Sequence, residues 1–154
     1  MIMHILFVCT GNTCRSPMSE GLLRSALAAK GLDQVTVSSA GTGAWEGAPV
    51  SEASYLVGLE QGLDLSEHRA RLLTRDIVRG ADLILVMSGH HLARVAELGG
   101  EDKVHLLGAY AGRDEGQTEV SDPYGADLST YRATYSELQD LIGNVVSRVA
   151  GTVR

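Results

Sequence analysis

The feature that most restricts the fold of this chain is the apolar run at residues 81–87, ADLILVM. An apolar run of this length is typical of a strand that is covered on both faces, as in a parallel sheet. Three other segments also predict strands, and they lie at residues 3–8, 35–40 and 103–107. The chain therefore offers four candidate strands for one sheet.

Helical segments lie between these strands and after the last one. Their expected bounds are residues 17–30, about 51–61, about 89–98 and about 128–149. Gly31, Gly62 and Gly99 follow the first three segments, and glycine is a common residue just past a helix end. Apolar residues of the last segment recur at three- and four-residue steps and form one stripe. Alternating strands and helices predict an α/β fold with a parallel sheet wound on both sides.

The length and composition are those of one globular domain spanning residues 1–154. The net charge is −6 and no basic cluster stands out, so nucleic acid is not an expected partner. Two cysteines do not make a disulfide scaffold. The first eight residues lack the basic region of a signal peptide, and no apolar run is long enough to span a membrane. We therefore expect a cytoplasmic protein with no membrane partner.

The strongest functional indication is the segment CTGNTCRSP that follows the first predicted strand. Cys9 ends the strand, and Arg15 and Ser16 follow after five intervening residues, where a helix begins. The N–H groups of such a loop and of the helix N-terminus face one point, which attracts an anion. A thiol in that field ionises more easily and can attack phosphorus. Arg15 can donate two hydrogen bonds to one phosphate group.

The remaining residues of the loop fit the same chemistry. The backbone N–H groups from Thr10 onward can hold the phosphate oxygens on which charge spreads in the transition state. Gly11 permits close approach of the backbone, and Asn12 tolerates a left-handed conformation. Ser16 can donate a hydrogen bond to the thiolate and stabilise it as a leaving group.

Three other interpretations of the loop are disfavoured. A cysteine can be a small buried hydrophobe at a strand end, but its spacing to Arg15 argues against that role here. A zinc site that used Cys9 and Cys14 would need a second ligand pair at a suitable spacing, and none follows. A Walker loop ends in Gly-Lys-Ser/Thr, which is missing. We expect neither a metal nor a cofactor.

Five motifs occur in order along the chain. They are CTGNTCRSPM at residues 9–18, SAGT at 39–42, HRAR at 68–71, ADLILVM at 81–87 and DPY at 122–124. In these motifs the sequence resembles the low-molecular-weight protein phosphatases. The resemblance implies a four-stranded parallel sheet flanked by helices on both faces, in three layers. It also implies that Cys9 is the nucleophile, Arg15 the phosphate clamp and Asp122 the general acid.

Asp122 lies at the end of a polar, glycine-rich segment, residues 109–122, which predicts a long loop. One carboxyl group on such a loop can protonate the leaving atom and later take a proton from the attacking water. The residues alone leave an ordinary turn at Asp122-Pro123-Tyr124 equally open. The resemblance favours the catalytic role.

The substrate class has two main candidates. Related arsenate reductases need further cysteines downstream, and none follows Cys14. Thr13 resembles the bacterial protein-arginine phosphatases, since tyrosine-directed members usually have Ile there. Tyr124 departs from the Phe of the arginine-directed pattern and keeps phosphotyrosine open. We expect a phosphorylated protein as substrate, with phosphoarginine ahead of phosphotyrosine. A phosphate-binding module without turnover is a third candidate, but it would not need Asp122.

Two residues near the expected site carry alternative roles. Trp45 is expected either to form a pocket wall with Tyr124 or to be a partly buried anchor of its own loop. Cys14 is expected close to Cys9, where it either forms a protective disulfide or simply packs. Both Trp45 and Cys14 are therefore included among the candidate substrate-binding residues.

Several residues outside the loop are expected to be structural. His68 resembles a family histidine that braces the loop through hydrogen bonds. His90 and His91 are adjacent on a predicted helix and are expected to point apart, so a shared metal site is not expected. Tyr131 and Tyr135 are expected in the core along the last helix. A monomer is the default expectation.

Overall fold

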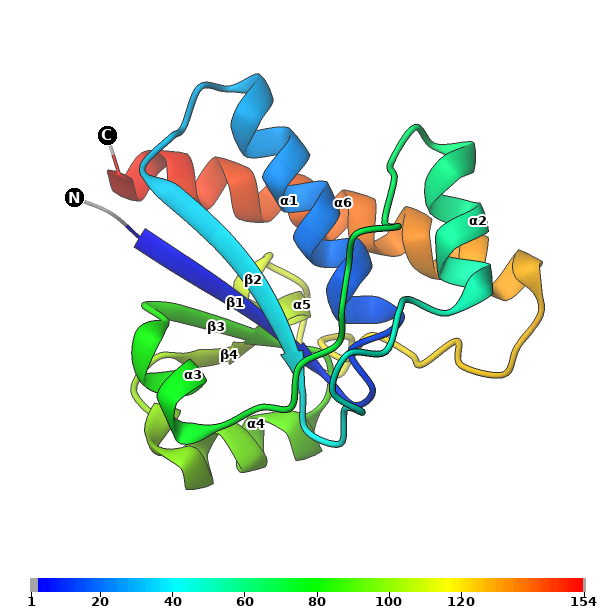
Figure 1. The fold of residues 1–154 in the computed structure, drawn as a ribbon. Helices are drawn as coiled ribbons and strands as arrows, with labels where there is room; N and C mark the ends of the chain where they lie inside the picture. The colour runs from blue at the N-terminus through cyan, green and yellow to red at the C-terminus, as the bar shows by residue number, and fades with distance from the viewer. Residues whose placement is uncertain (1–2, 154) are drawn as a thin grey trace.

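The computed structural model describes residues 3–153, and a parallel sheet lies at its centre (Figure 1). Its strands within that range are β1 (Met3–Cys9), β2 (Val35–Gly41), β3 (Leu83–Val86) and β4 (Val104–Leu106). Their order across the sheet is β2-β1-β3-β4, and all neighbouring pairs are parallel. The prediction of a four-stranded parallel sheet is confirmed. Residues 1, 2 and 154 of the domain expected over 1–154 lie outside the described range.

Helices cover both faces of the sheet and complete the three expected layers (Figure 1). One side carries α1 (Arg15–Ala29) and α6 (Leu128–Val153), with α2 (Glu52–Glu60) packed against α6 and the short α5 (Leu107–Tyr110) nearby. The other side carries α3 (Arg75–Gly80), α4 (Gly89–Val95) and the π-helical turn η1 (Ala96–Gly100).

The alternation of side chains along β1 produces two separate apolar cores. Ile5 and Phe7 belong to the core under α1 and α6, whereas Leu6 and Val8 belong to the core under α3 and α4. All four side chains are fully buried. Successive residues of a strand point to opposite faces, so a central parallel strand must be apolar at every position.

The carboxyl end of β1 is the point where the strand order reverses. The chain runs from β1 to β2 on one side and then to β3 on the other. Cys9 is the last residue of β1 and lies in register with Gly41, the last residue of β2. A loop of residues 10–14 joins this strand end to the N-terminus of α1. Parallel α/β sheets bind ligands in such a crevice.

Some element boundaries differ from those predicted. α3 and α5 were not predicted, because helices of six and four residues are too short to display an apolar stripe. α5 also takes up the beginning of the long loop predicted at 109–122. The helix predicted at 89–98 ends as α4 and continues as η1, where Gly99 has a φ of 95°. The last helix extends beyond residue 149 to Val153.

Candidate active site

A cavity of about 300 Å³ lies at the carboxyl end of β1. It is lined by Cys9, Thr10, Gly11, Thr13, Cys14, Arg15, Gly43, Trp45, Asp122 and Tyr124. Three segments that are distant in the sequence therefore meet there. All the lining residues except Gly43 were among the candidate site residues. The two remaining candidates, Asn12 and Ser16, are fully buried within the loop and support it from inside.

Cys9 lies at the bottom of the loop with its thiol in a defined hydrogen-bond chain. The side chain is 2% exposed, and Sγ lies 2.9 Å from Ser16 Oγ. Asn12 Nδ2 donates to the same Ser16 oxygen at 2.8 Å. Because that bond occupies one lone pair of the oxygen, the Ser16 hydroxyl hydrogen is available to donate to sulfur. A hydroxyl in this position can stabilise negative charge that develops on the sulfur.

Asn12 is the hub of the loop, and its backbone φ of 57° is left-handed, as predicted. Its Nδ2 group also donates to Ser39 Oγ at 2.9 Å, and its Oδ1 accepts the Arg71 backbone N–H at 2.9 Å. Its carbonyl oxygen lies 2.7 Å from His68 Nε2. The predicted bracing by His68 is therefore present. Burial lowers the pKa of His68, so the neutral ring donates to this carbonyl through Nε2–H.

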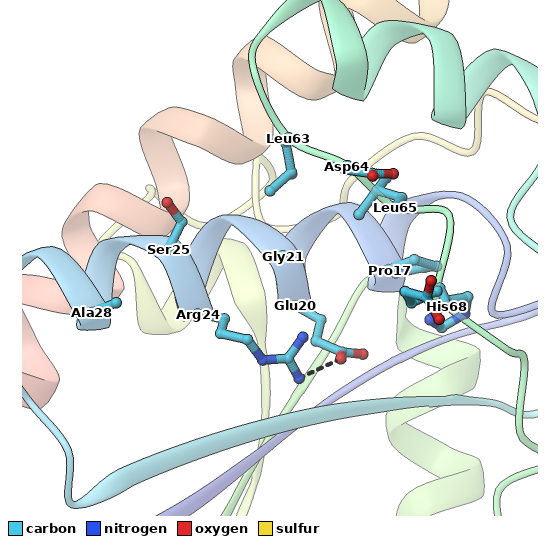
Figure 2. Close-up of a pocket in the computed structure, with 11 residues that line it drawn as sticks. Pro17, Glu20, Gly21, Arg24, Ser25, Ala28, Leu63, Asp64, Leu65 and His68 are labelled. Atoms are coloured by element: carbon cyan, nitrogen blue, oxygen red, sulfur yellow. Dashed lines mark hydrogen bonds and ion pairs between the residues drawn. The ribbon is translucent and has the colours of Figure 1, made fainter.

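Charged residues of α1 support this hub, and Figure 2 shows the Glu20–Arg24 ion pair among them. Ser39 Oγ donates to Glu20 Oε1 at 2.5 Å, and Glu20 Oε2 accepts from Arg24 Nη2 at 2.6 Å. Glu20, Arg24 and His68 all line a second cavity of about 360 Å³ between α1 and residues 63–68. Hydrogen bonds thus connect the surface of α1 to the thiol through Ser39, Asn12 and Ser16.

Arg15 is 3% exposed, and its guanidinium is held from one side. Nη1 donates to the Val120 carbonyl oxygen at 2.9 Å and to Ser88 Oγ at 3.4 Å. Nη2 lies 3.5 Å from Asp122 Oδ2. Nε is buried and has no hydrogen-bond partner among the described residues. An unpaired buried donor is costly, and the Nε–Nη2 edge is the one that forks to two oxygens of a phosphate.

Asp122 lies on a loop that is anchored just before it. The Val120 N–H donates to the Met87 carbonyl oxygen at 2.9 Å, and the Val120 carbonyl accepts from Arg15. Asp122 Oδ1 accepts the Tyr124 backbone N–H at 3.0 Å. The Asp122 side chain is about half exposed, at 48%. The carboxyl group is therefore both tethered near Arg15 and open to water.

Two aromatic side chains form the outer wall of the cavity. Trp45 is 84% exposed and Tyr124 is 74% exposed, although both line the cavity. The alternative of Trp45 as a partly buried anchor is therefore wrong. Exposed aromatic rings beside a polar cavity are suited to stacking on a flat substrate group.

Cys14 is buried at the wall of the cavity, and both cysteines are free thiols. Its Sγ lies 3.3 Å from Tyr131 Oη and 3.4 Å from Ser51 Oγ. Burial raises the pKa of Tyr131 to about 12. Tyr131 and Tyr135 are 2% and 3% exposed, so the prediction that they are core residues is confirmed.

Two residues contact the loop in ways that the sequence did not indicate. A Cβ atom at Gly41 would collide with the Thr10 carbonyl oxygen and approach Asn12 N within 2.9 Å, so this position requires glycine. His91 is fully buried, with Nε2 2.8 Å from Thr10 Oγ1. The expectation that His90 and His91 point apart is wrong, because their ring centroids lie 4.0 Å apart. Within residues 3–153, no three His, Cys, Asp or Glu side chains gather as metal ligands.

The sequence matches the family described as low molecular weight phosphotyrosine protein phosphatase over residues 4–154. The chain belongs to this family. It is 37% identical over 149 residues to the probable low molecular weight protein-tyrosine-phosphatase EpsP of Ralstonia nicotianae, with 97% of each chain covered. It is 36% identical over 149 residues to the protein-arginine-phosphatase of Bacillus subtilis, with 96% of this chain and 97% of the relative covered.

A solved structure shows the same fold. The YwlE arginine phosphatase, in a mutant with a phosphorylated active-site serine, matches with a TM-score of 0.90 at 35% identity and 96% coverage of each chain. The predicted resemblance to the low-molecular-weight phosphatases is thereby confirmed. The chain is an enzyme of this phosphatase family, which excludes the module without turnover.

Proposed function

We propose that the enzyme hydrolyses phosphorylated protein side chains through a phosphocysteine intermediate at Cys9. The observation that carries this proposal is the buried, unpaired Nε of Arg15, a residue that lines the same cavity as Cys9. A phosphoryl group placed there would satisfy the guanidinium and lie against the sulfur. The phosphorylated active-site serine in the YwlE mutant supports the same position for the transferred group.

The reaction follows in two steps. The Cys9 thiolate forms a bond to phosphorus, the bond from phosphorus to the leaving oxygen or nitrogen breaks, and Asp122 protonates the leaving atom. In the second step Asp122 accepts a proton from water, the water oxygen bonds to phosphorus, and the phosphorus–sulfur bond breaks. Arg15 and the loop N–H groups stabilise the charge on the phosphoryl oxygens in both steps.

The electrostatics of the loop support this chemistry. α1 begins at Arg15, so its unpaired N–H groups and the positive end of its dipole lie next to the phosphate position. Gly11 and Thr13 line the same cavity, and their backbone N–H groups belong to the loop that surrounds it. The Ser16 hydroxyl stabilises the sulfur as a leaving group in the second step.

For the substrate we propose phosphoarginine, with phosphotyrosine as the alternative. Relatives of both kinds match this chain at 36–37% identity, so overall identity does not separate them. Thr13 lines the cavity and favours a polar guanidinium, whereas Tyr124 at the outer wall suits either group. Trp45 and Tyr124 can stack on a planar guanidinium or on a phenol ring.

We further propose a cytoplasmic enzyme whose partners are phosphorylated proteins. No helix within residues 3–153 is both long and apolar enough to cross a bilayer. Hydrolysis of an aryl phosphate tests the mechanism: Cys9→Ser should abolish it, and full activity of this variant would refute the proposal. Peptides that carry phosphoarginine or phosphotyrosine, compared by kcat/KM, then identify the substrate.

A further inference from the structure

His91 has no part in the mechanism above, although it touches the catalytic loop. The residue lies on α4 and is fully buried, and its Nε2 atom lies 2.8 Å from Thr10 Oγ1. Thr10 follows Cys9 directly and lines the active-site cavity. A buried polar group needs a hydrogen-bond partner, and here the partner belongs to the wall of the cavity.

The backbone determines which nitrogen of His91 carries the hydrogen. The Ser88 N–H donates to Nδ1 at 3.1 Å, so Nδ1 presents a lone pair. In the neutral ring the hydrogen then lies on Nε2. Burial, followed by electrostatic repulsion from His90 and Arg15, lowers the pKa of His91 to about 4, so the ring is neutral at neutral pH. His91 therefore donates to Thr10 Oγ1.

This bond leaves the Thr10 hydroxyl hydrogen with no acceptor in the described part of the chain. The bond to His91 is the hydrogen bond that the Thr10 side chain makes there. The Thr10 methyl group faces Gly43, where an added Cβ would lie 3.8 Å from Cγ2. Thr10 itself is exposed. The hydroxyl hydrogen is thus free to meet an oxygen that enters the cavity.

We propose that His91 is a positioning residue that orients the Thr10 hydroxyl as a hydrogen-bond donor to the phosphoryl group of the substrate. The inference rests on the proposed function, because that function locates the phosphoryl group over Cys9. His91 touches no substrate and acts through Thr10. Because the ring is neutral, it directs the hydroxyl without adding a charge beside Arg15.

Four single variants separate this role from simple packing. In His91→Asn the amide oxygen can still accept from the Ser88 N–H, but the shorter side chain does not reach Thr10. In His91→Gln the amide nitrogen lies near the former Nε2 and can still donate to Thr10. Thr10→Val keeps the shape and removes the hydroxyl. His90→Asn is the matched control, since His90 is exposed and its ring contacts His91 at a tilted angle, with centroids 4.0 Å apart.

The measurements are kcat and KM for an aryl phosphate and the inhibition constant of inorganic phosphate. We expect His91→Asn and Thr10→Val each to lower kcat/KM and to weaken phosphate inhibition by about tenfold, the effect of one hydrogen bond. The double variant should lose no more than Thr10→Val alone, because the two residues act as one unit. His91→Gln should recover most of the loss, and His90→Asn should match the wild type.

Two results would overturn the proposal. In the first, Thr10→Val binds phosphate and turns over as the wild type does. In the second, the losses of the double variant multiply to about a hundredfold, as independent effects do. Thr10→Val carries the test even where His91→Asn fails to fold. A wild type that neither hydrolyses the ester nor binds phosphate would refute the proposed function as well, which distinguishes the two failures.

Discussion

Arg15→Lys tests the central claim that a forked guanidinium holds the phosphate. In the wild type Nη1 donates to the Val120 carbonyl, Nε is unpaired, and Nη2 makes only a long 3.5 Å ion pair with Asp122 that a phosphate oxygen can replace. Lysine keeps the charge but has one nitrogen on a flexible stem, so it cannot hold Val120 and two phosphate oxygens together. At least one hydrogen bond to a charged group is lost, worth about 1.5–3 kcal/mol. We expect kcat/KM to fall about 10- to 150-fold.

Steady-state hydrolysis of an aryl phosphate, with phosphate as competitive inhibitor, measures this loss. Arg79→Lys is the matched control, because Arg79 is an exposed arginine of α3 whose side chain pairs with Asp76 at 2.9 Å. Phosphate should also raise the melting temperature of the wild type more than that of Arg15→Lys, because it binds the wild type more tightly. If Arg15→Lys keeps kcat/KM within about threefold of the wild type, the fork is not what binds phosphate.

Asp122→Asn should lower kcat for a phosphopeptide about 100-fold or more while phosphate still binds, as inhibition assays will show. Thr13→Ile should shift the ratio of kcat/KM values from phosphoarginine toward phosphotyrosine peptides. An unchanged ratio would mean that the cavity walls, Trp45 and Tyr124, determine the substrate preference instead. Gly41→Ala should destabilise the fold by about 1–3 kcal/mol in urea melts, whereas Gly143→Ala should not, because an added Cβ there would meet no neighbouring element of the described structure within 4 Å. Because the pKa of His91 is lowered from 6.5 to about 4, the unfolded chain binds more protons below pH 6.5. The free energy of unfolding should therefore decrease as the pH is lowered from 6.5 to 4, and it should decrease less steeply in His91→Asn than in the wild type.

The sheet and the Cys9 loop could be predicted because their signals are local. β3 is an apolar run, and the loop combines a nucleophile, small residues and Arg15 within a few positions. The roles of Asn12 and His91 depend on partners that only the fold brings together. Asn12 bonds to Ser39 across 27 positions, and His91 bonds to Thr10 across 81. No local sequence pattern predicts hydrogen bonds between residues this far apart along the chain.

The position of Asp122 shows the same limit. The resemblance identified it as the acid, but its ion pair with Arg15 requires the Val120 anchor, which ties the loop to the end of β3. The sequence leaves two roles open for Trp45, a pocket wall or a partly buried anchor of its loop, because a single aromatic residue in a loop carries no periodic signal. Its exposure in the structure decided between the two.

The ion pair between Arg15 and Asp122 also bears on how the product leaves. The Asp122 carboxylate lies 3.5 Å from the guanidinium nitrogen that a phosphate group needs, so the two anions compete for one cation. Under the proposed function, the Asp122 carboxylate would compete with the phosphate product for Arg15 from a position two residues after Val120. The Asp122 carboxylate could then displace bound phosphate from Arg15 without a second ligand. If phosphate binds Arg15 as proposed, removal of this charge in Asp122→Asn should strengthen inhibition by phosphate.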